Sequence, residues 1–154
     1  MVVPYHGKNK LWLVGGTYPC NSSEYVDIGG SIPGPDIPIS DPDDVIRCNE
    51  GVAMVAIADG ISMIIGPGDV YTPSETYLFT YFDTWTPGPP LKKGRDGHAA
   101  GTLTDTMTKD IVVAVVGGHD GYNATLDSVE ILYPEEHEWM EGITLIFTPF
   151  NLAI

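Results

Sequence analysis

The sequence predicts an all-β chain built from a repeated antiparallel unit, and three observations support that prediction. Glycine and proline account for 18 and 13 of the 154 residues, about a fifth of the chain, which leaves little room for long helices. Three apolar runs end in a glycine turn, and their first glycines stand at positions 15, 66 and 117, always 51 residues apart. Such a constant period indicates an array of supersecondary units. The other apolar runs are short and bounded by turn residues, as antiparallel strands are.

The strands can be placed unit by unit from these runs. In the first unit we expect three strands, at Met1–Tyr5, Leu11–Val14 and Glu24–Ile28. In the second unit we expect four, at Val52–Ala58, Ile61–Ile65, Thr76–Phe82 and Trp85–Thr86. In the third unit we expect four, at Gly97–Leu103, Ile111–Val116, Ser128–Tyr133 and Trp139–Glu141. Asp59-Gly60 suits a two-residue hairpin turn. The Pro/Asp-rich stretch 29–44 leaves the last strand of the first unit open.

The glycine turns and the tryptophans are interpreted as structural. Glycine reaches positive φ without a Cβ clash and allows a neighbouring group to approach closely. A tryptophan near the end of a unit, Trp85 in the second and Trp139 in the third, offers a large apolar surface for packing against the next sheet. We therefore expect both features to stabilise the stack of sheets rather than to perform chemistry.

The third unit resembles the kelch repeat. Its matching elements are Arg95 and His98 before the first strand, Gly117-Gly118 after the second, Leu126-Asp127-Ser128-Val129-Glu130 leading into Tyr133, and Trp139 six residues after that tyrosine. The second unit keeps Phe79 and Trp85 at the same separation but reads Gly66-Pro67 in place of a glycine pair. The first unit departs further, because no tryptophan lies between Gly16 and Cys48.

The resemblance implies kelch-type β-propeller blades, each a four-stranded antiparallel sheet. The units expected are 1–46 (a degenerate kelch-like unit), 47–94 (a kelch-like unit), 95–145 (a kelch unit) and 146–154 (the start of a missing blade, or a tail). Radial closure usually takes at least four blades, so an incomplete ring is expected. Either the sequence is a fragment of a longer propeller, the favoured explanation, or copies associate to complete a ring. An open ring should leave the isolated chain marginally stable or self-associating.

Charge and composition narrow the function classes. Lys and Arg number 7 against 21 Asp and Glu, a formal net charge of −14, so electrostatic binding of nucleic acid is not expected. The residues Met1–Tyr5 have neither the basic start nor the long apolar run of a secretory signal, so none is expected, and the longest uncharged apolar runs are strand-sized, so no membrane span is expected. Localisation stays open, with the cytoplasm slightly favoured. Two cysteines, Cys20 and Cys48, allow one disulfide at most and no metal-binding cysteine cluster.

Catalytic, cofactor and metal sites are not expected from the motifs. There is no Gly-x-Ser-x-Gly, phosphate loop or His-Glu-x-x-His, and the four histidines are scattered. His98 is interpreted as a hydrogen-bonded packing residue. The leading hypothesis is a non-catalytic module for protein–protein interaction. The alternative is a fragment of a propeller-containing enzyme of the copper radical oxidase or sugar-processing type, with its catalytic residues outside this chain, since neither cysteine lies beside a recognisable copper motif.

Candidate partner-binding residues fall in loops that should emerge on one face of successive blades. They are Tyr18, Arg47, Tyr71, Arg95, His119 and Tyr122. Tyrosine and arginine dominate binding hot spots, and an arginine fork would select a partner carrying carboxylates. Two structural alternatives stay open: the arginines form inter-blade salt bridges, and the tyrosines merely cover the blade ends.

Overall fold

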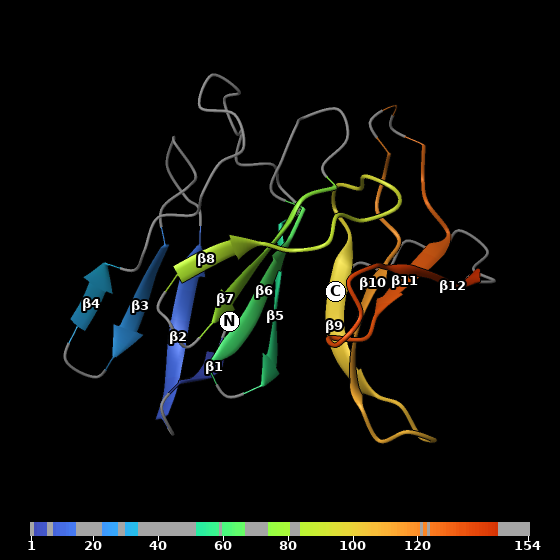
Figure 1. The fold of residues 1–154 in the computed structure, drawn as a ribbon. Coiled ribbons are helices and arrows are strands. Elements are labelled where there is room, and N and C mark those ends of the chain that lie inside the picture. Colours follow the sequence, from blue (N-terminus) through green and yellow to red (C-terminus); the bar gives the residue numbers. More distant parts are fainter. Residues whose placement is uncertain are drawn as a thin grey trace.

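In the computed structural model the described residues form three four-stranded antiparallel sheets that do not close into a ring, so the fold is all-β (Figure 1). The structure describes residues 2–5, 8–14, 23–27, 30–33, 52–58, 60–66, 74–80, 84–120, 122 and 124–144. These residues form no helix, so none of them belongs to a helix that could cross a membrane. Each sheet pairs its strands in chain order, which is the meander expected for a blade.

The first sheet consists of β1 (Val2–Tyr5), β2 (Lys8–Val14), β3 (Ser23–Asp27) and β4 (Gly30–Pro33). Its fourth strand lies within the Pro/Asp-rich stretch where the sequence left the strand open. The backbone nevertheless pairs from Asp27 with Gly30 to Glu24 with Pro33. Proline is tolerated there because β4 is an edge strand whose outer side needs no donor. The degenerate first unit therefore still forms a complete four-stranded sheet.

The second sheet consists of β5 (Ala53–Ala58), β6 (Ile61–Ile65), β7 (Thr76–Thr80) and β8 (Thr84–Pro87). Ala58 pairs with Ile61, and Gly60 takes a φ of 69°, so the predicted two-residue hairpin is confirmed. β6 has the predicted bounds, and the other strands differ from prediction by at most two residues at either end.

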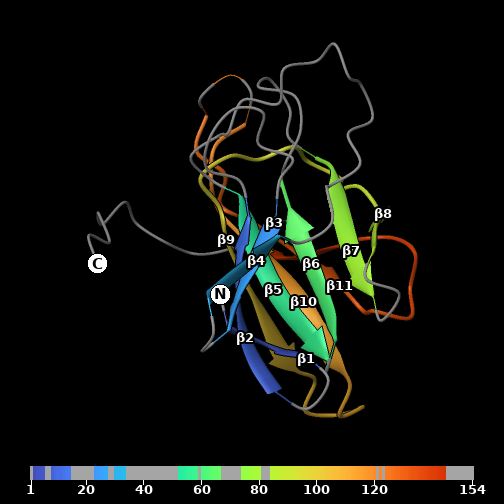
Figure 2. The ribbon, with the colours of Figure 1, turned by 90° about the vertical axis from the view of Figure 1, so that its left-hand side faces the viewer.

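The third sheet consists of β9 (Ala99–Thr104), β10 (Ile111–Val116), β11 (Ser128–Leu132) and β12 (Met140–Thr144). Each run before the glycines at 15, 66 and 117 is the second strand of its sheet, namely β2, β6 and β10. The registers agree, since Ile65 pairs with Thr76 and Val116 pairs with Val129. The period of 51 residues thus marks equivalent strands of successive sheets. Figure 2 shows these sheets one behind the other.

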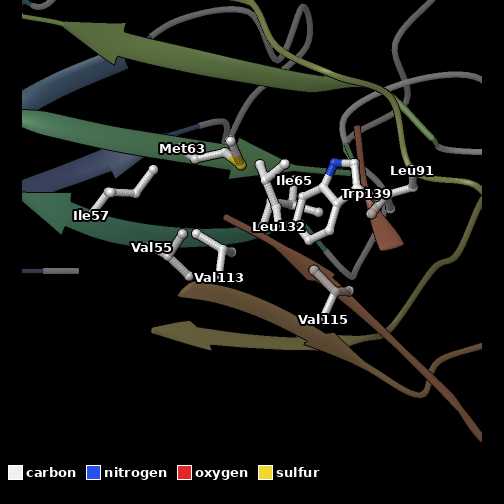
Figure 3. Packing of buried hydrophobic residues seen from close by; sticks show 9 residues of the cluster. All are labelled: Val55, Ile57, Met63, Ile65, Leu91, Val113, Val115, Leu132 and Trp139. Carbon is white, nitrogen blue, oxygen red and sulfur yellow. The ribbon is translucent and has the colours of Figure 1, made fainter. Parts of the chain in front are cut away.

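A shared hydrophobic core joins the second and third sheets (Figure 3). Its buried members are Val55, Ile57, Met63 and Ile65 from the second sheet, Leu91 from the link, and Val113, Val115, Leu132 and Trp139 from the third sheet and its β11–β12 connection. Trp139 is fully buried, and its indole Nε1 donates a hydrogen bond of 2.8 Å to the carbonyl of Pro89. The tryptophan was expected to pack against the next sheet. It packs instead against the sheet that precedes it in the chain.

The opposite face of the second sheet carries a second core cluster of Ile64, Tyr77, Phe79 and Trp85. Ile64 lies between two residues of the shared core, and alternation along the strand turns it to the other face. The rings of Phe79 and Trp85 are 5.1 Å apart and tilted by 53°, within the range of favourable aromatic pairs. Trp85 occupies the position that Trp139 occupies one unit later. Each of the two tryptophans therefore packs on the face of its sheet that points toward the preceding unit of the chain.

The outer face of the third sheet is not covered by the part of the chain that the structure describes. Leu103 is 57% exposed there, and a shallow hollow of about 180 Å³ lies over the small residues Ala99, Gly101 and Ala114. The equivalent face of the second sheet is buried by the third. An uncovered face of this kind agrees with blades that do not close into a ring.

Candidate functional site

Two segments come together at one end of the third sheet, the link 88–98 before β9 and the described part of the loop 117–127 after β10 (Figure 1). The amide of Asp96 donates to the carbonyl of His119 at 2.9 Å, and the amide of His119 donates to the carbonyl of Asp96 at 2.8 Å. Leu126 closes the base of the loop through a 2.8 Å bond from its amide to the carbonyl of Gly118. We call the surface that the link 88–98 and the described part of the loop 117–127 form the loop face.

The six sequence-predicted residues divide into two groups of three. Tyr18, Arg47 and Tyr71 lie outside the described residues. Arg95, His119 and Tyr122 all lie in the two segments of the loop face, as the strand directions predicted. Their exposures differ, however, and so do the roles that their side chains can take.

Arg95 is fully buried and does not reach the surface of the loop face. Its Nη2 lies 2.6 Å from Oε1 of Glu130, and its Nη1 donates to the carbonyls of Gly117 at 2.9 Å and Ser128 at 3.1 Å. With both Nη groups engaged in this way, the guanidinium cannot donate a pair of hydrogen bonds to a partner carboxylate. The structure therefore favours the ion-pair alternative for Arg95, although Glu130 belongs to the same sheet and not to another blade.

Glu130 uses the same carboxylate to hold the backbone of the link. Its Oε2 accepts a 2.7 Å hydrogen bond from the amide of Lys92, and its Oε1 accepts a 3.1 Å bond from the amide of Lys93. Burying a carboxylate is costly unless it is paired and fully hydrogen-bonded, and here both conditions are met. The sequence analysis assigned no role to Glu130. The available signal was an ionisable residue in the middle of the apolar strand 128–132.

His98 is buried at the junction of the second and third sheets. Its Nδ1 lies 3.2 Å from the carbonyl oxygen of Arg95. A Cβ built on Gly66 would lie 2.7 Å from Cε1 of His98, and one on Gly118 would lie 2.5 Å from the carbonyl oxygen of Asp96. Both glycines have φ near +90°, so an alanine at either position would be strained as well as crowded. The packing role predicted for His98 agrees with this geometry.

The buried environment lowers the pKa of His98 below its usual 6.5. Loss of hydration is the main cause, because it penalises the charged imidazolium, and the nearby charge of Arg95 acts in the same direction. The backbone of Arg95 and the carboxylate of Asp96 oppose the shift. His98 is therefore held as a neutral ring at neutral pH.

The tip of the β10–β11 loop presents Tyr122 to solvent, with 92% of the residue exposed. Oδ1 of Asp120 accepts two hydrogen bonds of 2.9 Å, from the amides of Tyr122 and Ala124. The amide of Asp120 donates in turn to the carbonyl of Ala124 at 3.0 Å. An Asp side chain that bonds to the backbone two residues later is a common way to fix a turn. His119 is also exposed and adjoins this tip.

The chemistry available on the loop face is polar recognition. Among the described residues, no three His, Cys, Asp or Glu side chains gather closely enough to hold a metal ion. Glu130 neutralises the charge of Arg95 inside the sheet. Among the described candidate residues, no arginine is therefore left to bind a partner that carries carboxylates. Among the described residues, the exposed polar groups at the tip include the phenol of Tyr122, the imidazole of His119 and the hydroxyl of Thr125.

Comparison with known protein families matches the Kelch motif to residues 115–142. The chain carries a kelch motif. The matched segment runs from the end of β10 through the tip loop and β11 to the start of β12, and it includes Glu130 and Trp139. The resemblance drawn from the sequence is confirmed, and so is the expectation of four-stranded kelch blades in an open arrangement. No curated protein matches the chain.

We predict that breaking the buried ion pair in this kelch unit is strongly destabilising. Glu130→Ala or Arg95→Ala should each lower the free energy of unfolding by about 3–5 kcal/mol, because each leaves a buried charge without its partner. Chemical denaturation measures the change. Glu138→Ala is the matched control, since its pair with Lys92 (3.0 Å) is solvent-exposed and should contribute less than about 1 kcal/mol. Equal losses for the buried and the exposed pair would contradict this account.

We also predict a pH dependence of stability that comes from His98. Because burial lowers the folded-state pKa below 6.5, the unfolded chain binds the proton more readily. The stability that neutral His98 contributes to the folded state is therefore present above about pH 6.5 and is lost as the pH falls below that value. Unfolding free energies measured between pH 7.5 and 5 should fall less steeply for His98→Gln than for the parent chain. The exposed His137 gives the control, and its Gln variant should keep the parental slope. Parallel slopes for all three proteins would refute the assignment.

Proposed function

We propose that this chain is a non-catalytic protein-interaction module whose partner binds the loop face around Tyr122. The observation that supports the proposal is the tip of the β10–β11 loop, where a nearly fully exposed tyrosine stands on a turn fixed by Asp120. Large aromatic side chains on monomer surfaces are characteristic of interfaces, and tyrosine is enriched among hot-spot residues.

The rigidity of the tip favours binding over simple surface exposure. The loop is tied to the link through Asp96 and His119, and the link is tied to β11 through Glu130. Asp120 holds the backbone amides of Tyr122 and Ala124, and a tyrosine has few side-chain torsions to immobilise, so little entropy should be lost when a partner binds Tyr122. Loops held by a rigid scaffold are the usual location of binding residues.

The buried ionisable groups near this face are engaged in structure, which supports the non-catalytic proposal. Arg95 and Glu130 neutralise each other, and His98 is enclosed at the sheet junction. The copper-oxidase alternative depends on cysteine chemistry, and Cys20 and Cys48 lie outside the described residues. Because Arg95 is fully buried and both of its Nη groups are engaged within the sheet, we infer recognition through aromatic and hydrogen-bonding contacts of Tyr122 and His119.

The experiment places a photo-crosslinking phenylalanine analogue at position 122 and, as the control, at position 103. Leu103 is a suitable control because it is 57% exposed on the outer face of the third sheet, away from the loop face. We expect a specific protein adduct from position 122 and none with that protein from position 103. The partner, once identified and purified, is then titrated against Tyr122→Ala and Leu103→Ala.

Tyr122→Ala should weaken binding of that partner by tenfold or more, since truncating a hot-spot tyrosine costs about 1–4 kcal/mol. Leu103→Ala should leave the affinity unchanged. Unaltered affinity of the folded Tyr122→Ala variant, or a partner that crosslinks equally from both positions, would remove the loop face as the binding site.

A further inference from the structure

A cavity of about 490 Å³ lies at the other end of the interface between the second and third sheets. It is bounded by the end of β5, by the β9–β10 turn and by the start of the β11–β12 connection. In Figure 1 the end of β5 and the β9–β10 turn both lie at the lower end of the molecule, away from the loop face. The volume falls within the range of about 300–1,000 Å³ that is typical of ligand sites.

The inner lining of the cavity is apolar. Ile57 comes from the shared core of the second sheet, and Ala58 follows it at the end of β5. Ile111 begins β10 on the opposite side and is 43% exposed. An isoleucine left half open at the mouth of a cavity offers surface that a ligand can remove from water.

The rim of the cavity is acidic. Asp110, Glu135 and Glu136 line it, all three residues are exposed, and no ion pair joins them to another described residue. Among the described residues of the lining the one cation is Lys109, whose Nζ donates a 2.7 Å hydrogen bond to the carbonyl of Thr106. The carboxylates of the rim are therefore not neutralised from within the lining.

A further carboxylate holds the wall of the cavity in place. The hydroxyl of Tyr133, a lining residue, donates a 2.7 Å hydrogen bond to Oδ2 of Asp105. This bond, together with those from the amides of Met107 and Thr108, lowers the pKa of Asp105, so that it stays ionised. The negative charge of Asp105 thus orients Tyr133. It also makes the electrostatic potential at the cavity more negative.

These features select one class of ligand. The rim carboxylates are not grouped as metal ligands, because no set of three acidic, His or Cys groups within the described residues could hold an ion. An apolar interior with a negative rim instead suits a side chain that has an apolar stem and a positive head. The whole chain carries a net charge of −14, which would draw a cationic segment toward it.

We propose that this cavity binds a basic peptide segment of a partner, with an arginine or lysine stem packed against Ile57 and Ile111 and its charged head at Asp110, Glu135 and Glu136. The site is separate from the loop face and does not depend on the partner proposed for Tyr122. It would give the chain a second contact surface, at the opposite end of the same pair of blades.

The test is an NMR titration of the full chain with a capped pentapeptide of alternating leucine and arginine. We expect chemical-shift changes at the methyl groups of Ile57 and Ile111 that saturate with peptide. The triple variant Asp110→Asn, Glu135→Gln, Glu136→Gln should bind at least tenfold more weakly, and 0.5 M salt should weaken binding to the parent chain. Asp127→Asn, an exposed carboxylate of the loop face, should bind as the parent does.

A second variant tests the cavity itself rather than its charge. Ala58→Phe places an uncharged ring in the lining of the cavity, and it should abolish peptide binding while the other amide resonances keep their positions. Four outcomes would overturn the proposal: no binding by the parent chain, equal binding of a matched leucine–glutamate peptide, equal binding by the triple variant, or shifts confined to Leu103 on the outer face of the third sheet.

Discussion

The buried contact between Arg95 and Glu130 is the interaction on which the rest of the described structure depends. Arg95 belongs to the link that leads from the second sheet to the third, and Glu130 belongs to a central strand of the third sheet. By pairing with Arg95 and accepting the amides of Lys92 and Lys93, Glu130 fixes the path of the link across the sheet. Neither ion could be buried alone, so the link and the sheet are expected to form and to open together.

The position of the link then determines how the two blades meet. The carbonyl of Pro89 accepts one hydrogen bond from Oγ1 of Thr76 in the second sheet and another from the indole of Trp139 in the third, both at 2.8 Å. At the end of the link, His98 fills the space left by Gly66 and Gly118. The same geometry creates both candidate surfaces. It presents Tyr122 on an ordered tip at one end and leaves the acid-rimmed cavity between the blades at the other.

The repeat could be predicted from the sequence because its main signal is local. β6 and β10 are apolar, β-branched runs that end at glycine, and their bounds follow from composition alone. β4 could not be placed, because it begins with glycine and ends with proline, both depleted in strands, and it depends on pairing with β3. The location of Arg95 was also beyond sequence reasoning, since its partner lies 35 residues away and only folding shows that the link returns over β11. The exposure of Tyr122 could be expected from its position in a loop, whereas its role in binding stays a prediction.

Native-state hydrogen exchange of the full chain, followed by NMR, tests the central role of the ion pair most directly. The amides of Lys92 and Lys93 and the indole N–H of Trp139 should exchange with the same opening free energy as the amides of β10 and β11, because link and sheet open as one unit. The amide of Asp110, whose bond to the Thr108 hydroxyl lies in an exposed turn, should exchange far sooner. Exchange of the link amides at the rate of Asp110, while β10 and β11 remain protected, would contradict the account.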